Sequence, residues 1–194
     1  MFHVSVLRCA SCNGILSAKT RSRILICNHC NSPNEFRKGD VHKVNVTYAS
    51  SPGRSPDEQV YVPFWVLDTD IMISSMKIIG GKIRRFVKGE HSFDGNHRIW
   101  ITAGNIPELQ GEEFGFRYSQ NQPVYSIGKT PHIPDIPVSC DHGEAMQTAE
   151  YFFLKNEVKR SGTLQSIDYS IDFSGYELVY LPFEKKEDML RPIL

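Results

Sequence analysis

The spacing of four cysteines, C-x2-C-x14-C-x2-C, constrains the fold of this chain more than any other feature. Each C-x-x-C turn places two thiolates on one side of a tight loop, with backbone amides directed at the sulfurs. Two such turns facing each other supply a closed tetrahedral shell of four sulfurs, which suits Zn²⁺ with Zn–S distances of about 2.3 Å. The sequence therefore predicts one structural Zn²⁺ ion bound by Cys9, Cys12, Cys27 and Cys30.

The residues around each cysteine pair agree with such a site. Asn13-Gly14 follows the first pair and Asn31 follows the second. Asn and Gly adopt the positive φ of such turns at little cost. Because four thiolates fill the shell, His29 is expected to be an exposed loop residue. The metal is expected to replace a hydrophobic core that is too small to hold about 35 residues together.

The N-terminal part resembles the zinc-ribbon family over residues 5–38. Short strands are expected at Ile15-Leu16 and at 23–26, with a turn at 19–22 between them. Typical zinc ribbons have Pro after the first Cys of a pair and Gly directly after the second, whereas this chain has Ala and Asn at those positions. A rubredoxin-like iron site would use the same four ligands, but C-x-x-C pairs in intracellular ribbons usually hold zinc.

A second motif occurs twice. Residues 58–64 and 177–183 are identical at five of seven positions, 119 residues apart. Both copies alternate and are rich in β-branched and aromatic residues, which predicts strands. Pro63 and Pro182 cannot donate a ladder hydrogen bond, so each is expected at an edge, a bulge or a strand end. The copies are interpreted as equivalent strands in one sheet or in two related half-units, with chance convergence on a strand-end motif as the alternative.

These pieces together resemble a group of uncharacterised bacterial zinc-ribbon proteins with Tyr-x-Pro-Phe strand motifs. The matching segments are Cys9 to Cys30, Tyr61 to Trp65 and Leu178 to Phe183. The resemblance implies an architecture and a bacterial source, and it implies no reaction.

The rest of the chain predicts a β-rich body with one main helix. That helix is expected at 143–160, where apolar residues follow the helical period and acidic residues precede basic ones. Residues 104–142 are rich in glycine and proline and are expected to be mostly irregular. Strands are expected at 41–49, 60–67, 71–79 and 98–103, with a turn at 68–70, and a hairpin is expected between 164–173 and 177–183 across Ser174-Gly175.

The predicted fold class is α+β, mainly β. A zinc ribbon in residues 1–40 is followed by a β-rich domain in residues 41–194, in which the main helix packs on a sheet. The chain shows no run of about 18 apolar residues, and its start, MFHVSVLRCASC, has no basic segment followed by an apolar one, so we expect a cytoplasmic protein without a membrane span.

Charge is distributed unevenly along a chain whose formal net charge is zero. Residues 1–88 contain 13 basic and 6 acidic side chains, and residues 89–194 contain 9 and 16. A basic cluster without intervening acids could contact nucleic acid or an acidic partner: Lys77, Lys82, Arg84, Arg85 and Lys88. The alternative is that the two halves pack on each other or are simply solvated.

Two groups of residues could carry chemistry. One is Cys140-Asp141-His142 with His132, and the other is His91, Asp94 and His97. Either could hold a nucleophile and its base or a second metal. Neither has a known catalytic signature, no phosphate-binding loop is present, and Cys140 is more simply read as a buried, small apolar residue.

The sequence thus favours a non-catalytic interaction or assembly subunit of a larger complex, with a structural zinc ion and protein partners. Extended Pro-rich segments and exposed-looking aromatic residues, Trp65 and Trp100, favour this hypothesis. A nucleic-acid-binding zinc-ribbon protein is the alternative, although a pI near 7.0 argues against it. A small-molecule substrate is not expected.

Overall fold

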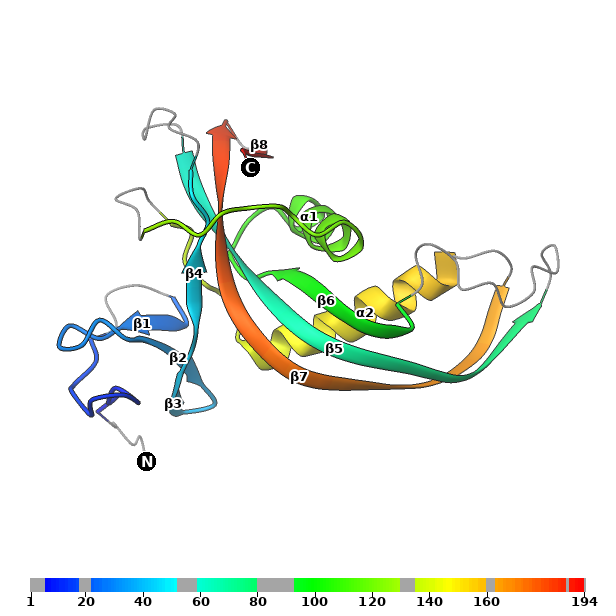
Figure 1. Ribbon diagram of the computed structural model, residues 1–194, viewed down its shortest axis with the longest axis horizontal. Helices are drawn as coiled ribbons and strands as arrows, with labels where there is room; N and C mark the ends of the chain where they lie inside the picture. Colours follow the sequence, from blue (N-terminus) through cyan, green and yellow to red (C-terminus); the bar gives the residue numbers. More distant parts are fainter. Residues whose placement is uncertain are drawn as a thin grey trace.

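The computed structural model describes residues 6–17, 22–51, 59–79, 93–129, 135–159, 163–187 and 189–193. Within them, a three-stranded antiparallel sheet contains β1 (Ile24–Ile26), β2 (Pro33–Arg37) and β3 (Asp40–Lys43). A five-stranded sheet has the order β4 (Val46–Tyr48), β7 (Thr163–Lys186), β5 (Gln59–Ile79) and β6 (Gly95–Thr102), and β8 (Met189–Pro192) pairs with β7. The helices are α1 (Glu108–Gln120) and α2 (His142–Lys159) (Figure 1). The expected mainly β, α+β fold class is confirmed.

The N-terminal sheet extends past residue 40, because β3 pairs with β2 as far as Lys43. The expected strand at 41–49 is therefore wrong as a single element: its first part belongs to the N-terminal sheet and its second part, β4, pairs in parallel with β7. The division of the chain into units at residue 40 stays a prediction.

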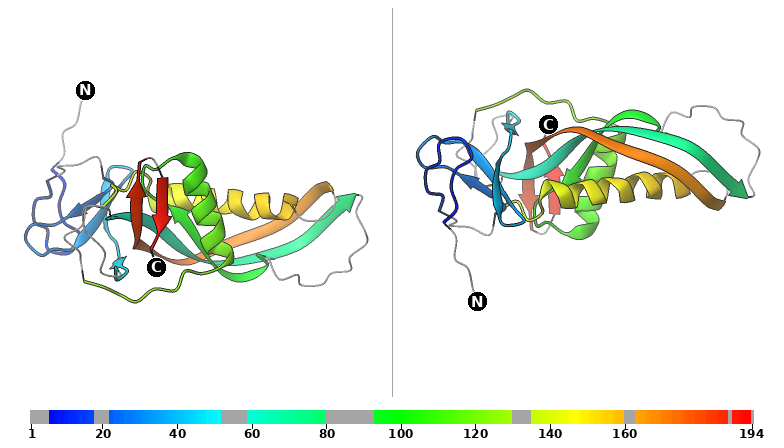
Figure 2. Two further views of the ribbon diagram at one scale, coloured as in Figure 1. Left: turned by 90° about the horizontal axis from the view of Figure 1, so that it is seen from above. Right: turned by 90° about the horizontal axis from the view of Figure 1, so that it is seen from below.

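Strands β5 and β7 form one long antiparallel pair, from Gln59 opposite Glu184 to Ile79 opposite Thr163. The pair curves away from the N-terminal part with the cysteines and strands β1 to β3, which we call the ribbon. The pair forms an elongated arm (Figures 1 and 2). The turn expected at 68–70 is wrong, because Asp68 and Asp70 stay paired with strands on both sides. The hairpin across Ser174-Gly175 is also wrong: Ser174 is an extra residue at a register shift, and a bulge bends a strand without ending it.

The repeated motif forms the centre of this pair. Val62 lies opposite Leu181, and Tyr61 and Pro63 lie opposite Pro182 and Tyr180. Equivalent residues of the two copies are thus related by a local two-fold axis between the strands. The interpretation as two equivalent strands in one sheet agrees with this register.

Each proline lies where a third strand stops. The Pro63 carbonyl accepts the N–H of Ala103 (2.9 Å) just beyond β6, and the Pro182 carbonyl accepts the N–H of Ile193 (3.1 Å) just beyond β8. Pro63 has no N–H that could donate to the Ala103 carbonyl, so this carbonyl accepts the Ser139 N–H instead (2.8 Å). The prolines therefore limit β6 and β8 without interrupting β5 or β7.

The main sheet is covered on both faces. One face packs Trp65, Tyr61 and Tyr180 with Ala149 and Phe153 of α2. The other face packs its apolar residues against α1: Phe64, Trp100 and Phe183 with Phe114 and Tyr118. Trp65 and Trp100 are fully buried. The expectation that they are exposed was wrong, because the sheet is a middle layer with two apolar faces.

Helix α2 agrees with the helix expected at 143–160. It begins with a reciprocal pair of bonds, in which the Glu144 N–H donates to Asp141 Oδ1 (3.0 Å) and the Asp141 N–H donates to Glu144 Oε2 (2.8 Å). This is the arrangement of a capping box, with Asp in place of Ser or Thr.

Helix α1 lies within the segment expected to be irregular, so that expectation was wrong for Glu108–Gln120. Glycine made the segment resemble a loop. A Cβ on Gly115 would lie 2.8 Å from the Trp100 carbonyl oxygen and 2.9 Å from Phe152 Cε2. This glycine therefore allows a close approach of α1 to β6 and α2. In the described part of the chain, no helix is long and apolar enough to cross a membrane.

Replacing Phe64 should show how strongly the repeated motif stabilises the fold. Phe64 is fully buried and stacks on Phe183 with 6.1 Å between ring centroids. We expect Phe64→Ala to lower the free energy of unfolding by about 3–5 kcal/mol in urea denaturation. Met72→Ala is the matched control, because it changes the same strand at an exposed position and should cost less than about 0.5 kcal/mol. Equal effects would contradict this packing.

Candidate metal centre

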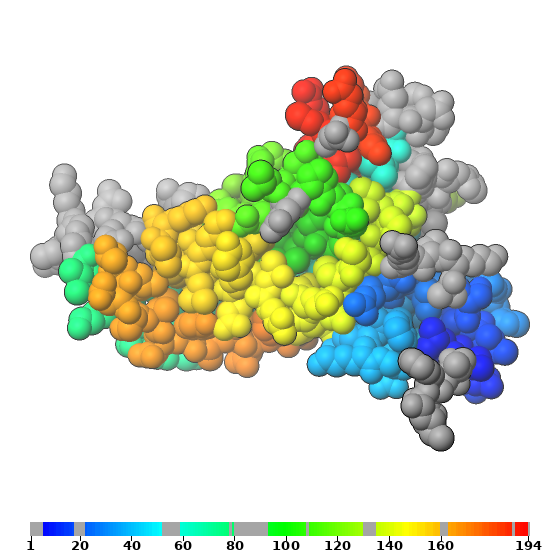
Figure 3. Space-filling view, turned by 180° about the vertical axis from the view of Figure 1, so that it is seen from behind, coloured from blue at the N-terminus to red at the C-terminus, as the bar shows by residue number. Residues whose placement is uncertain are grey.

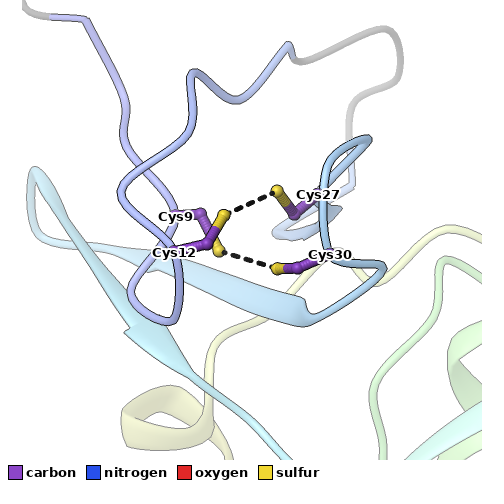
Figure 4. A group of neighbouring side chains, drawn as sticks. All are labelled: Cys9, Cys12, Cys27 and Cys30. Atoms are coloured by element: carbon purple, nitrogen blue, oxygen red, sulfur yellow. Dashed lines mark hydrogen bonds between the residues drawn. The ribbon is translucent and has the colours of Figure 1, made fainter.

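The four predicted cysteine ligands lie together, with all Sγ atoms within 4.8 Å of one another (Figure 4). Cys9 Sγ is 3.7 Å from Cys30 Sγ, and Cys12 Sγ is 3.6 Å from Cys27 Sγ. These separations are too long for disulfides, which have S–S near 2.05 Å. A tetrahedron with metal–sulfur bonds of about 2.3 Å has edges of about 3.8 Å, close to the observed separations.

The two cysteine pairs sit on loops of the same backbone geometry. In each loop the first cysteine's carbonyl accepts an N–H four residues later: Asn13 to Cys9 (2.9 Å) and Asn31 to Cys27 (2.8 Å). Asn13 and Asn31 have φ of 60° and 57°, which confirms the positive φ expected there. The N–H groups of Ser11 and His29 each lie 3.4 Å from the first sulfur of their loop.

The thiols affect one another's ionisation. Burial raises the pKa of Cys9, but hydrogen bonds from the backbone amides of Cys12 and Ser11 outweigh it and lower the pKa to about 6. At Cys12 the backbone amide of Gly14 lowers the pKa, but the side chains of Cys30 and Cys27 outweigh it and raise the pKa to about 12. The cluster thus resists full ionisation without a cation, and a bound divalent cation removes that conflict.

The donor set therefore fits a metal ion. Four sulfurs in a tetrahedron are the ligand set of structural zinc, and they leave no coordination position for water or substrate. The prediction that Cys9, Cys12, Cys27 and Cys30 form one site agrees with this geometry. His29 is exposed, as expected.

The strands around the centre differ from the expected pattern. Ile15 forms a bridge with Arg8, and β1 pairs with β2, which follows the second cysteine pair. The strand expected at 23–26 agrees with β1, whereas Ile15 forms only an isolated bridge, and most of the turn expected at 19–22 lies outside the described residues. Among the described residues beside the sulfurs, a small buried core contains Cys9, Leu16, Leu25 and Cys27. So small a core agrees with a structural role for the metal.

Asn34 connects the two cysteine loops, and sequence reasoning missed it. This fully buried side chain accepts the Ala10 N–H (2.9 Å) and donates to the Ser32 carbonyl (2.7 Å). Ala10 lies in the first loop and Ser32 follows the second. A polar residue at a buried position of a short strand was the available signal, because such a residue needs internal partners.

The next residue, Glu35, joins the ribbon to the body of the protein. Its carboxylate is fully buried and accepts the backbone N–H of His142 at the start of α2 (2.8 Å). The other carboxylate oxygen lies 2.6 Å from His142 Nδ1. The His142 ring stacks on Tyr176 of β7, with 4.0 Å between centroids. A carboxylate from β2 thus caps the N-terminus of a helix more than 100 residues away in the sequence; Figure 3 shows the ribbon adjoining this end of α2.

The residues of the candidate group Cys140-Asp141-His142 make contacts that hold the structure together. Cys140 Sγ faces the carbonyl oxygens of Ala103 and Thr102 (3.8 and 4.0 Å), and its own carbonyl accepts the Trp65 indole N–H (3.0 Å). Burial, together with the nearby carboxylates of Glu144 and Asp141, raises the pKa of Cys140 to about 12. The thiol is therefore protonated at neutral pH, and an unassisted thiol of this pKa is a poor nucleophile.

The remaining candidates are only partly described. Asp94 Oδ1 accepts the Ile73 N–H (3.3 Å), and the ring of His97 packs on Phe93. Among the described residues, the cysteines are the single group of three or more metal-binding side chains that lie close together. Lys77 is exposed on β5. Six of the candidates lie outside the described residues: Lys82, Arg84, Arg85, Lys88, His91 and His132.

A depression of about 380 Å³ lies between α1, α2 and the end of β6. Its one acidic side chain, Glu112, pairs with Lys155 of α2 and lies 3.4 Å from the Tyr151 hydroxyl. The lysine lowers the pKa of Glu112. The carboxylate is thus already neutralised by a neighbour.

Comparison with known proteins adds no relative. A scan against models of protein families, a search of curated proteins and a search of solved structures each gave no match. The resemblance to bacterial zinc-ribbon proteins stays a prediction.

Removing single ligands tests the metal centre. We expect Cys9→Ser and Cys30→Ser to lower bound zinc from about one ion per chain to near zero, because an S4 site with three thiolates loses much of its affinity. Cys140→Ser is the matched control and should retain zinc. Elemental analysis of reduced, purified protein measures this, and less than about one zinc per chain in the unaltered protein would contradict the centre.

Removing the Glu35 carboxylate tests the joint between ribbon and body. We expect Glu35→Ala to lower the free energy of unfolding by about 2–4 kcal/mol, because the His142 N–H and ring lose their buried acceptor. Amide hydrogen exchange in the first turn of α2 should rise while bound zinc is unchanged. Asp40→Asn removes an exposed carboxylate from the same sheet and should have little effect. Unchanged exchange in Glu35→Ala would refute this joint.

Proposed function

We propose that this chain is a non-catalytic zinc-ribbon protein that acts as an interaction or assembly subunit of a larger complex. The zinc has a structural role, because four cysteines close its coordination shell. Strand β2, which follows the second cysteine loop, places Glu35 at the start of α2. In the group that resembled a catalytic site, His142 connects Glu35 of β2 to Tyr176 of β7, and Cys140 contacts Trp65 of β5 and the end of β6.

One observation carries the proposal. Residues 121–129 have no helix or strand, yet their backbone is fixed on the body of the protein. The Ser50 N–H donates to the Ser126 carbonyl (2.8 Å), and the Gly128 N–H donates to the Tyr48 carbonyl (2.8 Å). This anchored segment exposes 91% of Val124 and 77% of Ile127.

An anchored, extended segment with exposed apolar side chains is suited to a protein contact. Little conformational entropy is lost there on binding, because the backbone is already ordered. Covering two branched apolar side chains removes unfavourable surface from water. Single exposed apolar residues are common, so the pairing of exposure with a fixed backbone supports the proposal.

The experiment is affinity capture of the tagged full-length chain from its own host, with and without nuclease. We expect a stoichiometric protein partner that survives nuclease and is lost in the double variant Val124→Asp/Ile127→Asp. Leu109→Asp is the matched control, because Leu109 is 82% exposed on α1, and it should retain the partner.

Two results would contradict the proposal. Recovery of nucleic acid, with protein partners lost on digestion, would favour the alternative in which the basic cluster from Lys77 to Lys88 contacts nucleic acid. A partner that persists in the double variant would remove residues 121–129 from the contact surface.

A further inference from the structure

Along most of the arm, the outer edge of β7 pairs with no strand among the residues that the structure describes. On this side β4 covers only Leu178 to Tyr180, and β8 pairs only with Phe183 to Lys186. Within the described residues, no hydrogen bond joins the edge from Thr163 to Phe173 to a strand other than β5. In Figure 1 this edge is the lower border of the arm.

Within this edge, eight residues repeat a four-residue pattern, Ser-Ile-Asp-aromatic. The copies are Ser166 to Tyr169 and Ser170 to Phe173. The register shifts that displace residues of β7 lie outside the eight residues, at Gln165 and Ser174, and a third shift, opposite Asp168 and Tyr169, displaces Ser74 of β5. Exposure alternates along β7 through all eight residues. This part of the strand contains neither Pro nor Lys, the residues that commonly protect a free edge.

The two faces beside this edge differ in chemistry. Ile167, Tyr169 and Ile171 face α2 and pack against the core, and the Tyr169 hydroxyl donates to Glu150 (2.7 Å). The side chains of the opposite face are exposed: Ser166, Asp168, Ser170 and Asp172. A strand added here would therefore meet an apolar row on one face and carboxylates on the other.

The carboxylates have no cationic partner within the described part of the chain. Asp172 lies directly opposite Asp70 of β5, and Asp168 accepts the hydroxyl of Ser75. Like charges that face each other across strands are destabilising. A basic side chain next to them would remove this repulsion. Asp68 differs, because Arg98 already pairs with it (2.9 Å).

A second copy of this strand fits poorly. Antiparallel pairing of two copies about Ser170 would place Asp168 opposite Asp172 of the second copy. A shift of the centre by one residue would leave the carboxylates diagonal to each other, still within reach. Charge complementarity therefore selects a basic strand.

We infer that the β7 edge from Ser166 to Phe173 binds an extended segment of a partner protein in which apolar residues alternate with Lys or Arg. The segment adds a strand to the sheet: its backbone pairs with β7, its apolar side chains extend the row beside α2, and its cations meet Asp168 and Asp172. This inference rests on the proposed function and names the chemistry of one partner segment.

The probe is a fluorescein-labelled ten-residue peptide that alternates valine and lysine, measured by fluorescence anisotropy with the full-length chain. Two further peptides carry N-methyl groups, one on its valines and one on its lysines. In a strand, all valine N–H groups point to one side and all lysine N–H groups to the other. We expect one methylated peptide to lose at least tenfold in affinity and the other to bind within about threefold of the parent.

Charge variants complete the test. Asp168→Asn/Asp172→Asn should weaken binding at least fivefold, whereas Asp40→Asn/Glu113→Gln removes two exposed charges elsewhere and should not. No binding of the parent peptide, or equal binding of the two methylated peptides, would overturn the inference. A chain that captures a stoichiometric partner yet binds none of these peptides would contradict only the β7 site and leave the proposed function standing.

Discussion

The antiparallel pairing of β5 with β7 is the interaction on which the rest of the structure depends. It brings together two copies of one motif that are 119 residues apart in the sequence, so that Val62 lies opposite Leu181. Their apolar residues point to both faces, and α1 and α2 cover one face each. The prolines of the motif stop the flanking strands while the central pair continues. The arm is the part of β5 and β7 that extends beyond the flanking strands (Figure 2).

The cysteine centre acts on this framework through a short chain of contacts. Asn34 connects the two cysteine loops, and Glu35, the next residue of β2, caps α2 and contacts His142. His142 stacks on Tyr176, which belongs to β7. A metal that holds the loops together therefore also fixes the position of Glu35, because both depend on the same short strand. The proposed structural role of zinc thus extends beyond the first 40 residues to the start of the main helix.

The sequence predicts the features that are encoded locally. The cysteine spacing, the asparagines with positive φ, the main helix and the strand character of both motif copies can all be read from neighbouring residues. Contacts between distant segments could not be read in this way. Asp68 and Ser174 look like turn residues, yet the strands continue because pairing partners lie beside them. Trp65 and Trp100 look exposed because a sequence does not show that helices cover both faces. Glu35 and His142 meet across 107 residues, and no local pattern marks that pair.

The most direct test of this account is X-ray absorption at the zinc edge on the reduced, purified full-length chain. The account predicts one zinc per chain with four sulfur neighbours at about 2.3 Å and no nitrogen or oxygen neighbour. A shell that includes nitrogen or oxygen would mean that the site has an open or exchangeable position. That result, or protein that folds fully without metal, would contradict the closed structural centre from which the placement of Glu35 and α2 follows.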